Sequence, residues 1–349
     1  MVASRSWHGR ARWVSRADIE SSYSSQSVSV KDSSRGKRNT LSSWITLFRE
    51  GQKEPDMGNY GQQEDSSLSE NNEHSDVLLI DDPIPGVRRL TMNRPEKRNS
   101  LIHPLRGAIL KALQDADMDP EVKVSIIRGA GPSFSAGYDL SGANAGHAMP
   151  FFTAGGEGQW PRHVTEGWMS IWDLAKPVIA QVHGYCLAGG SELATCCDLV
   201  YIAEDAQMGY PATRFGVPDM HFHTWFLGMR RAMEMMMTGD SITGVEAVAE
   251  GWANRAFPAE ELEEEVLAIA ERISKTPTDL TQLNKRVVHR QMEIMGLRTG
   301  IRAGTELCSL GIHTDSMKDF LGSIKEKGLT GALSDRDGEY GDYRTAESE

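Results

Sequence analysis

The chain carries the segment HGYCLAGGSELA at residues 183–194, which resembles the end of a strand, a glycine-rich turn and the start of a helix. A second glycine-containing loop, PSFSAGYDLSG, occupies residues 132–142 and also follows a strand-like run. Glycine allows the backbone to approach a ligand closely, and a helix N-terminus presents free N–H groups together with the positive end of the helix dipole. Two convergent N–H groups can hold a developing oxyanion. Together, the two loops predict an oxyanion-binding site.

Strand-like and helix-like runs alternate around these loops. The expected strands are residues 77–80, 87–93, 124–130, 177–184 and 198–204, with a DDPIPG turn at residues 81–86. Apolar spacing predicts a helix through residues 105–113, a second at about 166–174 and a short third after residue 190. This alternation favours parallel βαβ units. After residue 222 the pattern is almost wholly helical, so we expect an α/β core at residues 77–258 and a helical C-terminal region with a polar tail at residues 259–349.

The first 76 residues do not have the pattern of a folded domain. They contain SSYSSQSVSVKDSSRGKRNT and EDSSLSENNEHSD, which are polar and serine-rich with few apolar anchors. We therefore expect residues 1–76 to be a disordered or non-native extension, with Met57 as an alternative start. An opening rich in arginine and poor in acids is also typical of a transit peptide. The expected location is cytoplasmic, or mitochondrial if the extension is such a peptide.

The composition excludes several classes of protein. A formal net charge of −12 argues against nucleic acid as a partner, because phosphate binding needs basic surface. No apolar run approaches the roughly 20 residues of a membrane-spanning helix. The 4 cysteines show no CxxC pairing, which favours buried, reduced thiols.

Two further segments give the chain a family resemblance. They are NRPEKRNSL (93–101) and MTGDSITGVEAVAEGWANRAFP (237–258). With the two loops, in this order and spacing, the sequence resembles the crotonase superfamily, also called the enoyl-CoA hydratase/isomerase family, over about residues 77–327. The resemblance implies a crotonase-like spiral of ββα units with a helical C-terminal trimerisation region, and assembly into homotrimers or hexamers. It implies an acyl-CoA substrate, with coenzyme A present only as part of that substrate, no tightly bound cofactor and no metal.

The same resemblance assigns binding roles by position. The oxyanion would accept hydrogen bonds from the backbone N–H groups of Tyr138 and Gly189. The residues expected along the bound coenzyme A are Lys97, Arg98, Ser100, Leu101, Ala136 and Asp139, with Lys325 and Lys327 as weaker candidates for phosphate contact. Lys97 and Arg98 would supply the local positive charge that the chain as a whole lacks; surface side chains without a role are the alternative for these two.

The acidic residues depart from the family pattern. Family hydratases use two glutamates, and Glu192 matches the first. Ala212 occupies the position of the second, and a methyl group cannot transfer a proton. Asp219 is the candidate replacement, with helix capping as its alternative role. His221 and His223 follow at once and are either proton carriers or structural histidines.

Two segments are candidates for the acyl pocket. Aromatic residues Phe222, Trp225 and Phe226 would line it or belong to the core. The insert at residues 141–163 would form a mobile lid or a solvated loop, and its His147 or His163 could reach the acyl group. Four methionines in this region, Met233, Met235, Met236 and Met237, are expected to serve core packing and helical contact rather than a cofactor site.

The sequence thus predicts an acyl-CoA-processing enzyme of the enoyl-CoA hydratase type, which stabilises a thioester enolate. An enoyl-CoA isomerase, or a thioester or C–C hydrolase on the same scaffold, is the alternative within enzymes. A non-catalytic acyl-CoA-binding homologue is the alternative outside them, and Ala212 is its best support.

Overall fold

The computed structural model describes residues 77–341, so the expectations for residues 1–76 and 342–349 lie outside the described part of the chain. The strands are β1 (Leu78–Ile84), β2 (Val87–Met92), β3 (Val124–Gly129), β4 (Val178–Val182), β5 (Tyr185–Leu187), β6 (Leu199–Ala203), β7 (Gln207–Gly209), β8 (Ile242–Thr243) and β9 (Arg255–Phe257). The α-helices are α3 (His103–Met118), α4 (Gln159–Asp173), α5 (Gly189–Cys196), α6 (His223–Thr238), α7 (Gly244–Ala249), α8 (Leu262–Ser274), α9 (Thr278–Ile294), α10 (Leu297–Gly311) and α11 (Asp315–Gly338). Two 3-10 turns are η2 (Pro95–Lys97) and η3 (Pro211–Arg214).

A six-stranded sheet in the order β1-β2-β3-β4-β6-β9 forms the centre of the fold. The β1–β2 hairpin is antiparallel, and every other pairing in this sheet is parallel, as the alternating pattern predicted. The predicted turn at residues 81–86 is too long, because β1 continues to Ile84 across an irregularity in register after Asp81. The expected fold class, α/β, is confirmed.

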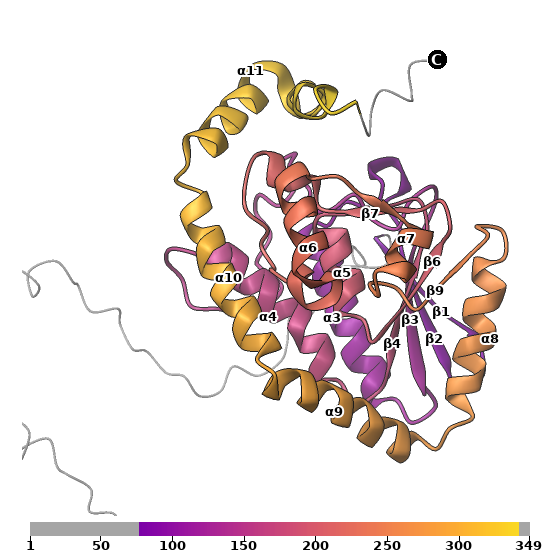
Figure 1. Ribbon diagram of the computed structural model, residues 1–349. Helices are drawn as coiled ribbons and strands as arrows, with labels where there is room; N and C mark the ends of the chain where they lie inside the picture. The colour runs from indigo at the N-terminus through magenta and orange to yellow at the C-terminus, as the bar shows by residue number, and fades with distance from the viewer. Residues whose placement is uncertain (1–76, 342–349) are drawn as a thin grey trace, which may run out of the picture. The chain divides into compact units, whose positions relative to one another are not determined.

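Helices cover both faces of this sheet. Helix α8 lies along one face, and α3, α4 and α5 lie on the other side (Figure 1). Because both faces are covered, the inner parallel strands are apolar runs: the five residues of β4 and five of the six in β3 are buried.

A smaller sheet, β5-β7-β8, links the core to the segment at residues 237–258. Strand β8 pairs antiparallel with β7 and ends at Thr243, which is also the N-cap of α7. The Thr243 hydroxyl accepts from the Glu246 N–H, and the Glu246 carboxylate accepts from the Thr243 N–H. This capping box explains why the run SITGVEA changes from strand to helix at that point.

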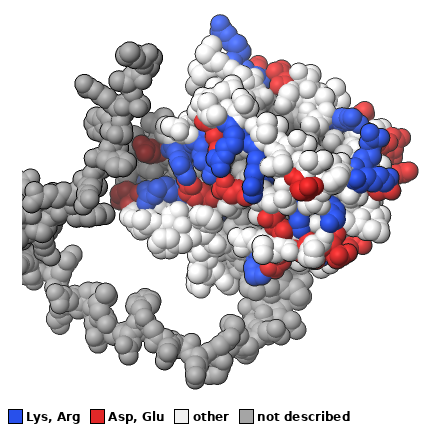
Figure 2. Space-filling view, turned by 90° about the horizontal axis from the view of Figure 1, so that it is seen from below, with Lys and Arg blue, Asp and Glu red and all other residues white. Residues whose placement is uncertain are grey.

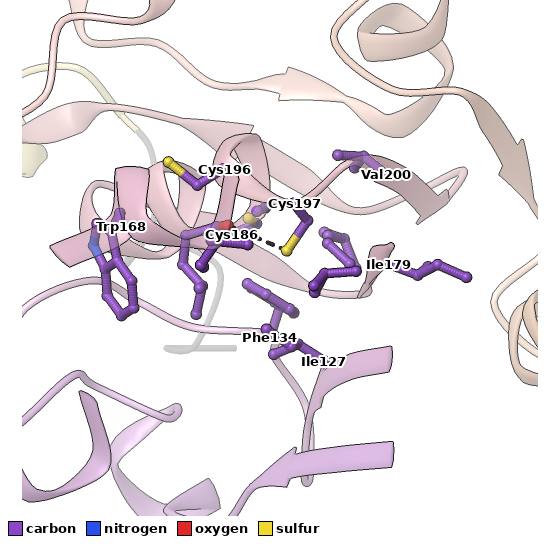
Figure 3. Packing of buried hydrophobic residues seen from close by; sticks show 14 of the residues in the cluster. Ile127, Phe134, Trp168, Ile179, Cys186, Cys196, Cys197 and Val200 are labelled. Atoms are coloured by element: carbon purple, nitrogen blue, oxygen red, sulfur yellow. Dashed lines mark hydrogen bonds between the residues drawn. The ribbon is translucent and has the colours of Figure 1, made fainter. Parts of the chain in front are cut away.

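The four cysteines are free and buried, as predicted. Cys186 and Cys197 pack among core residues near Phe134 and Ile179, whereas Cys196 lies on the other side of α5, with its Sγ 3.6 Å from Met220 Sδ (Figure 3). Burial raises the pKa of the Cys186 thiol well above its ordinary value. These thiols are therefore packing groups rather than nucleophiles.

The C-terminal region is helical, and α10 packs against both α4 and α9 (Figure 1). Beyond it, Arg214 of η3 holds the end of α11 through an ion pair of 3.2 Å with Asp337. The expectation that the methionine cluster is core is wrong for two members: Met233 and Met237 are 53% and 71% exposed, because they lie on the outer side of α6.

Charges of both signs are mixed on the face of the molecule that Figure 2 shows. Seen from below the molecule of Figure 1, Lys and Arg side chains lie next to Asp and Glu instead of forming a field of one sign (Figure 2). None of the helices between residues 77 and 341 has the length and apolar character needed to cross a membrane.

Candidate active site

Asn99 ties the segment before α3 to the loop after β3. Its side-chain amide is buried and donates hydrogen bonds to the carbonyl oxygens of Ala130 (2.9 Å) and Ser133 (2.8 Å), while its Oδ1 accepts from the Arg94 N–H (2.9 Å). The backbone of Asn99 adopts a left-handed conformation with φ of 52°, which asparagine tolerates better than most residues. The run NRPEKRNSL therefore fixes the position of the loop that carries Tyr138.

The backbone of Tyr138 forms a short parallel bridge with Leu101. The Leu101 N–H donates to the Gly137 carbonyl (2.8 Å), and the Asp139 N–H donates to the Leu101 carbonyl (3.2 Å). Since successive peptide groups of an extended segment point to opposite sides, the Tyr138 N–H points away from Leu101. Within residues 77–341 this N–H has no backbone acceptor, so it is available to a ligand.

The second loop presses directly against the first. Helix α5 begins at Gly189, whose N–H, in the first turn, has no acceptor within the helix. A Cβ added at Gly189 would lie 2.6 Å from ring atoms Cε2 and Cζ of Tyr138, and one at Gly137 would lie 2.9 Å from the Leu187 carbonyl. Only glycine fits at both positions, and the two expected oxyanion donors lie on adjoining loops.

Glu192 is the buried acid of the site. Its side chain is fully enclosed in the first turn of α5. Oε2 accepts a short hydrogen bond from the Tyr138 hydroxyl, and Oε1 accepts from the Tyr210 hydroxyl (2.8 Å) and the Met220 N–H (3.0 Å). Burial and the neighbouring Asp219 raise the pKa of Glu192 to about 8, although the hydrogen bonds from these three donors lower it. The carboxyl group can therefore hold a proton at neutral pH.

Asp219 lies beside Glu192, and Tyr210 connects them. The Tyr210 hydroxyl donates to Glu192 and accepts from the Asp219 N–H at 3.2 Å. Burial raises the pKa of Asp219, while hydrogen bonds from the side chains of Trp160 and Cys308 act in the opposite direction. The structure thus brings together the two carboxyl groups that the sequence proposed, while Ala212 lies half-buried in η3.

The two candidate histidines differ in surroundings. His223 is buried, stacks on Phe222 at 4.0 Å between ring centroids, and has a pKa lowered by burial to about 3. Burial also lowers the pKa of His221. Both imidazole rings are therefore neutral near pH 7. Phe222, for which the sequence left open a place in the acyl pocket or in the core, is a core residue. Trp225 and Phe226 are partly buried against the same core.

The residues expected along coenzyme A surround the first loop. Lys97 and Ala136 are exposed, and Arg98 lies over the Tyr185 ring at 5.1 Å. Asp139 is engaged inside the protein, because its Oδ2 accepts from Arg94 (3.2 Å) and from the Ser100 hydroxyl (3.0 Å). Asp139 therefore positions the loop rather than offering a free carboxylate. Of the weaker phosphate candidates, Lys327 pairs with Asp335.

The insert at residues 141–163 is only partly a loop. Helix α4 begins at Gln159, seven residues before the expected start near Glu166, so His163 lies inside a helix and is fully buried. Its Nδ1 lies 2.8 Å from the Trp160 carbonyl and its Nε2 lies 2.7 Å from Arg106 Nη1. Burial lowers the pKa of His163 to about 3, so the ring is neutral: Nδ1 carries the proton and donates it to the Trp160 carbonyl, and Nε2 accepts from Arg106. His147 stays in the exposed loop.

Sequence reasoning missed three side chains of the site: Tyr210, Trp168 and the phenol of Tyr138. Trp168 Nε1 donates to the Tyr138 hydroxyl at 2.9 Å, which in turn donates to Glu192. Tyr210 lies two residues before Ala212 in the GYPA run, and the family pattern gives that tyrosine no role. For Tyr138 the sequence predicts a role of the backbone N–H only.

A surface cavity of about 540 Å³ lies elsewhere, between β1, α3 and the insert. It is lined by residues such as Ile80, His103, Lys111 and Met149, and by none of the acids or oxyanion residues. No cluster of side chains suited to a metal ion occurs in the described part of the chain.

Comparison with known proteins shows the family and the fold of the chain. The sequence profile described as enoyl-CoA hydratase/isomerase matches residues 84–339. A Mycobacterium tuberculosis protein named as an enoyl-CoA hydratase is 33% identical over 237 residues, covering 62% of this chain and 74% of its own length. Zebrafish (Danio rerio) enoyl-CoA hydratase domain-containing protein 3, mitochondrial, is 32% identical, covering 62% of this chain and 75% of its own. The crystal structure of an enoyl-CoA hydratase/isomerase from Xanthobacter autotrophicus Py2 superposes with a TM-score of 0.69 at 31% identity, covering 75% of this chain and 98% of the other.

The fold and the paired loops define a crotonase-type protein. The chain belongs to the enoyl-CoA hydratase/isomerase family.

Proposed function

We propose that this protein is an enoyl-CoA hydratase-type lyase that adds water to a 2-enoyl-CoA through a thioester enolate. The observation that carries the proposal is the enclosed Glu192 carboxyl group, paired with Asp219 next to the loops that bear the Tyr138 and Gly189 N–H groups. Two carboxyl groups whose charges interact titrate at separated pH values, so one holds a proton while the other is ionised. Acid and base are then present together.

Each group has one role in the proposed reaction. The N–H groups of Tyr138 and Gly189 stabilise the thioester oxygen as it gains negative charge. Asp219 accepts the proton of the attacking water, whose oxygen bonds to the β-carbon, and Glu192 gives its proton to the α-carbon. The Tyr138 and Tyr210 hydroxyls orient Glu192 for that transfer.

Coenzyme A is proposed to lie along the first loop. Lys97 and Arg98 would attract its phosphates, and backbone and side chains of Ser100, Leu101, Ala136 and Asp139 would shape the path. We propose no tightly bound cofactor or metal.

Assembly and location complete the proposal. Residues 77–258 would form the catalytic core and residues 259–349 the assembly region, in a homotrimer or hexamer. Apolar side chains exposed along α9, including Leu280, Leu283 and Val287, support an interface there. We propose a cytoplasmic location; a mitochondrial one is the alternative, supported by the name of the zebrafish relative.

The test is loss of absorbance at the enoyl-thioester band with crotonyl-CoA and longer 2-enoyl-CoAs. Turnover that disappears in Glu192→Gln supports the proposal. Measurable binding of acyl-CoA esters without turnover of any of them would instead indicate a non-catalytic homologue.

A second candidate is an enoyl-CoA isomerase, favoured by the methyl group of Ala212 at the second glutamate position. An isomerase needs only one group to move a proton along the acyl chain, and Glu192 would suffice. Formation of the enoyl-thioester band from 3-hexenoyl-CoA, without hydration of crotonyl-CoA, would select this reaction. Release of free coenzyme A would select a hydrolase.

A further inference from the structure

Arg106 is a cation enclosed beside the reaction site. Its side chain, on α3, has no exposed surface. The guanidinium carbon lies 5.1 Å from the ring centroid of Trp168, 5.4 Å from that of Tyr138 and 5.7 Å from that of Trp160. Two of these three rings, Tyr138 and Trp168, belong to the hydrogen-bonded chain that ends on Glu192.

Among the described residues, the guanidinium of Arg106 has no hydrogen-bonded partner of opposite charge. Its Nη1 is taken by His163 Nε2, a neutral group, at 2.7 Å. Its Nε and Nη2 have no hydrogen-bond acceptor among residues 77–341, and no salt bridge to Arg106 occurs there. Arginine stays protonated even when buried, so the fold encloses a positive charge that no carboxylate binds directly, although Glu192 and Asp219 attract it through space.

The two unpartnered nitrogens lie on one edge of the guanidinium. Elsewhere in the protein the same edge binds a carboxylate: Nε and Nη2 of Arg302 donate to the two oxygens of Glu166 at 2.6 Å and 2.7 Å. Arg89 uses the same edge for Asp81. In Arg106 this fork, which matches a carboxylate in shape and charge, is buried and free.

The position of Arg106 separates it from the coenzyme A end of the site. Lys97, a candidate for the phosphates, is exposed, and Arg98, the other candidate, is half-buried, whereas Arg106 is fully buried. Arg106 is enclosed by aromatic rings, and the acids whose charges act on it are Tyr138, Glu192 and Asp219. An anion that reaches Arg106 therefore belongs to the acyl group.

We propose that the acyl group of the substrate carries a second carboxylate, which pairs with the Nε–Nη2 edge of Arg106. The substrate class is then a short-chain dicarboxylic acid monothioester of coenzyme A. An unsubstituted enoyl chain would leave the buried cation unpaired. This inference names the substrate class of the hydratase proposed above. The reaction of that substrate rests on the proposed function, whereas the binding of its carboxylate by Arg106 does not.

The test uses two saturated thioesters of matched shape, so that binding is measured without turnover. Glutaryl-CoA carries a terminal carboxylate, and 5-methylhexanoyl-CoA carries an isopropyl group of similar size in its place. Calorimetric titration of the full-length protein should show glutaryl-CoA bound about 10- to 100-fold more tightly, the effect of hydrogen bonds to a charged group. Arg106→Met should abolish this preference, and Arg302→Met, which removes the same fork from a surface ion pair, should retain it.

Equal affinity of the two esters for the wild-type protein would overturn the inference, as would a preference that persists in Arg106→Met. If Arg106→Met fails to fold, the affinities of the wild-type protein for the two esters still test the inference. Arg106→Lys keeps the charge but loses the fork, so it should show a reduced preference for glutaryl-CoA. Hydration of crotonyl-CoA without a carboxylate preference would refute this inference alone. Arg106-dependent binding of glutaryl-CoA without hydration of any enoyl-CoA would refute the hydratase proposal alone.

Discussion

Replacing Glu192 by glutamine should make the stability of the protein less sensitive to pH. The amide has nearly the shape of the carboxyl group and offers an oxygen to Tyr210 and the Met220 N–H. It cannot ionise. The comparison therefore isolates the cost of placing a negative charge at this enclosed position.

The sign and size follow from the pKa. The folded-state pKa of Glu192 is about 8, above the ordinary value of 4.5, so the folded protein keeps a proton that the unfolded chain releases between these values. The resulting stability is fully present below about pH 4.5 and is lost as the pH rises towards 8. Between about pH 5.5 and about pH 7.5 the wild-type protein should lose about 2.5 kcal/mol of unfolding free energy through this group, and the glutamine variant should not.

Urea unfolding of both proteins, followed by circular dichroism at the two pH values, measures this quantity. Taking the difference between wild type and variant at each pH cancels the titration of groups that do not interact with Glu192, so the difference reports Glu192 together with its neighbour Asp219. Parallel stability curves across this range would show that Glu192 is not held protonated by the fold. The assignment of Glu192 as the proton donor would then fail.

Three further substitutions test the site. Tyr138→Phe keeps the backbone N–H but removes the hydroxyl between Trp168 and Glu192, so kcat/KM for a 2-enoyl-CoA should fall about 10- to 100-fold. Unchanged kinetics would show that only the backbone N–H of Tyr138 contributes to the reaction. Asp219→Asn removes a charge that raises the pKa of Glu192, so the pH profile of the residual hydration activity should move to lower pH. Full activity with an unchanged pH profile would exclude Asp219 from the mechanism. Ala188→Gly relieves a non-glycine φ of 48° and should raise the free energy of unfolding by about 1 kcal/mol in a denaturant titration; a destabilised variant would contradict the idea that the turn before α5 is strained.

The sequence alone determined the framework of this protein. Strand-like and helix-like runs alternate with distinct periods, and that pattern is local, so the α/β core, the parallel pairing and the start of α5 near Gly189 could all be predicted. The oxyanion loops and Glu192 were recognisable because their motifs are contiguous. The element boundaries were less accurate: α4 starts earlier than expected, since its first turn lies within an insert rich in glycine and proline.

The tertiary structure alone decided how the side chains share the site. Tyr138 and Tyr210 are 54 and 18 residues from Glu192 along the chain, yet both hydroxyls bind its carboxyl group. Arg106 and His163, 57 residues apart, meet inside the protein, and only that meeting shows that the Nε–Nη2 edge of the arginine is left free. Such contacts depend on how helices pack, and burial sets the pKa values that follow, because desolvation is a property of the whole surrounding and of no single segment. The sequence therefore pointed to the two loops that we propose hold an enolate, while the packing of α3 and α4 against α5 placed Arg106 and Trp168 beside that proposed site.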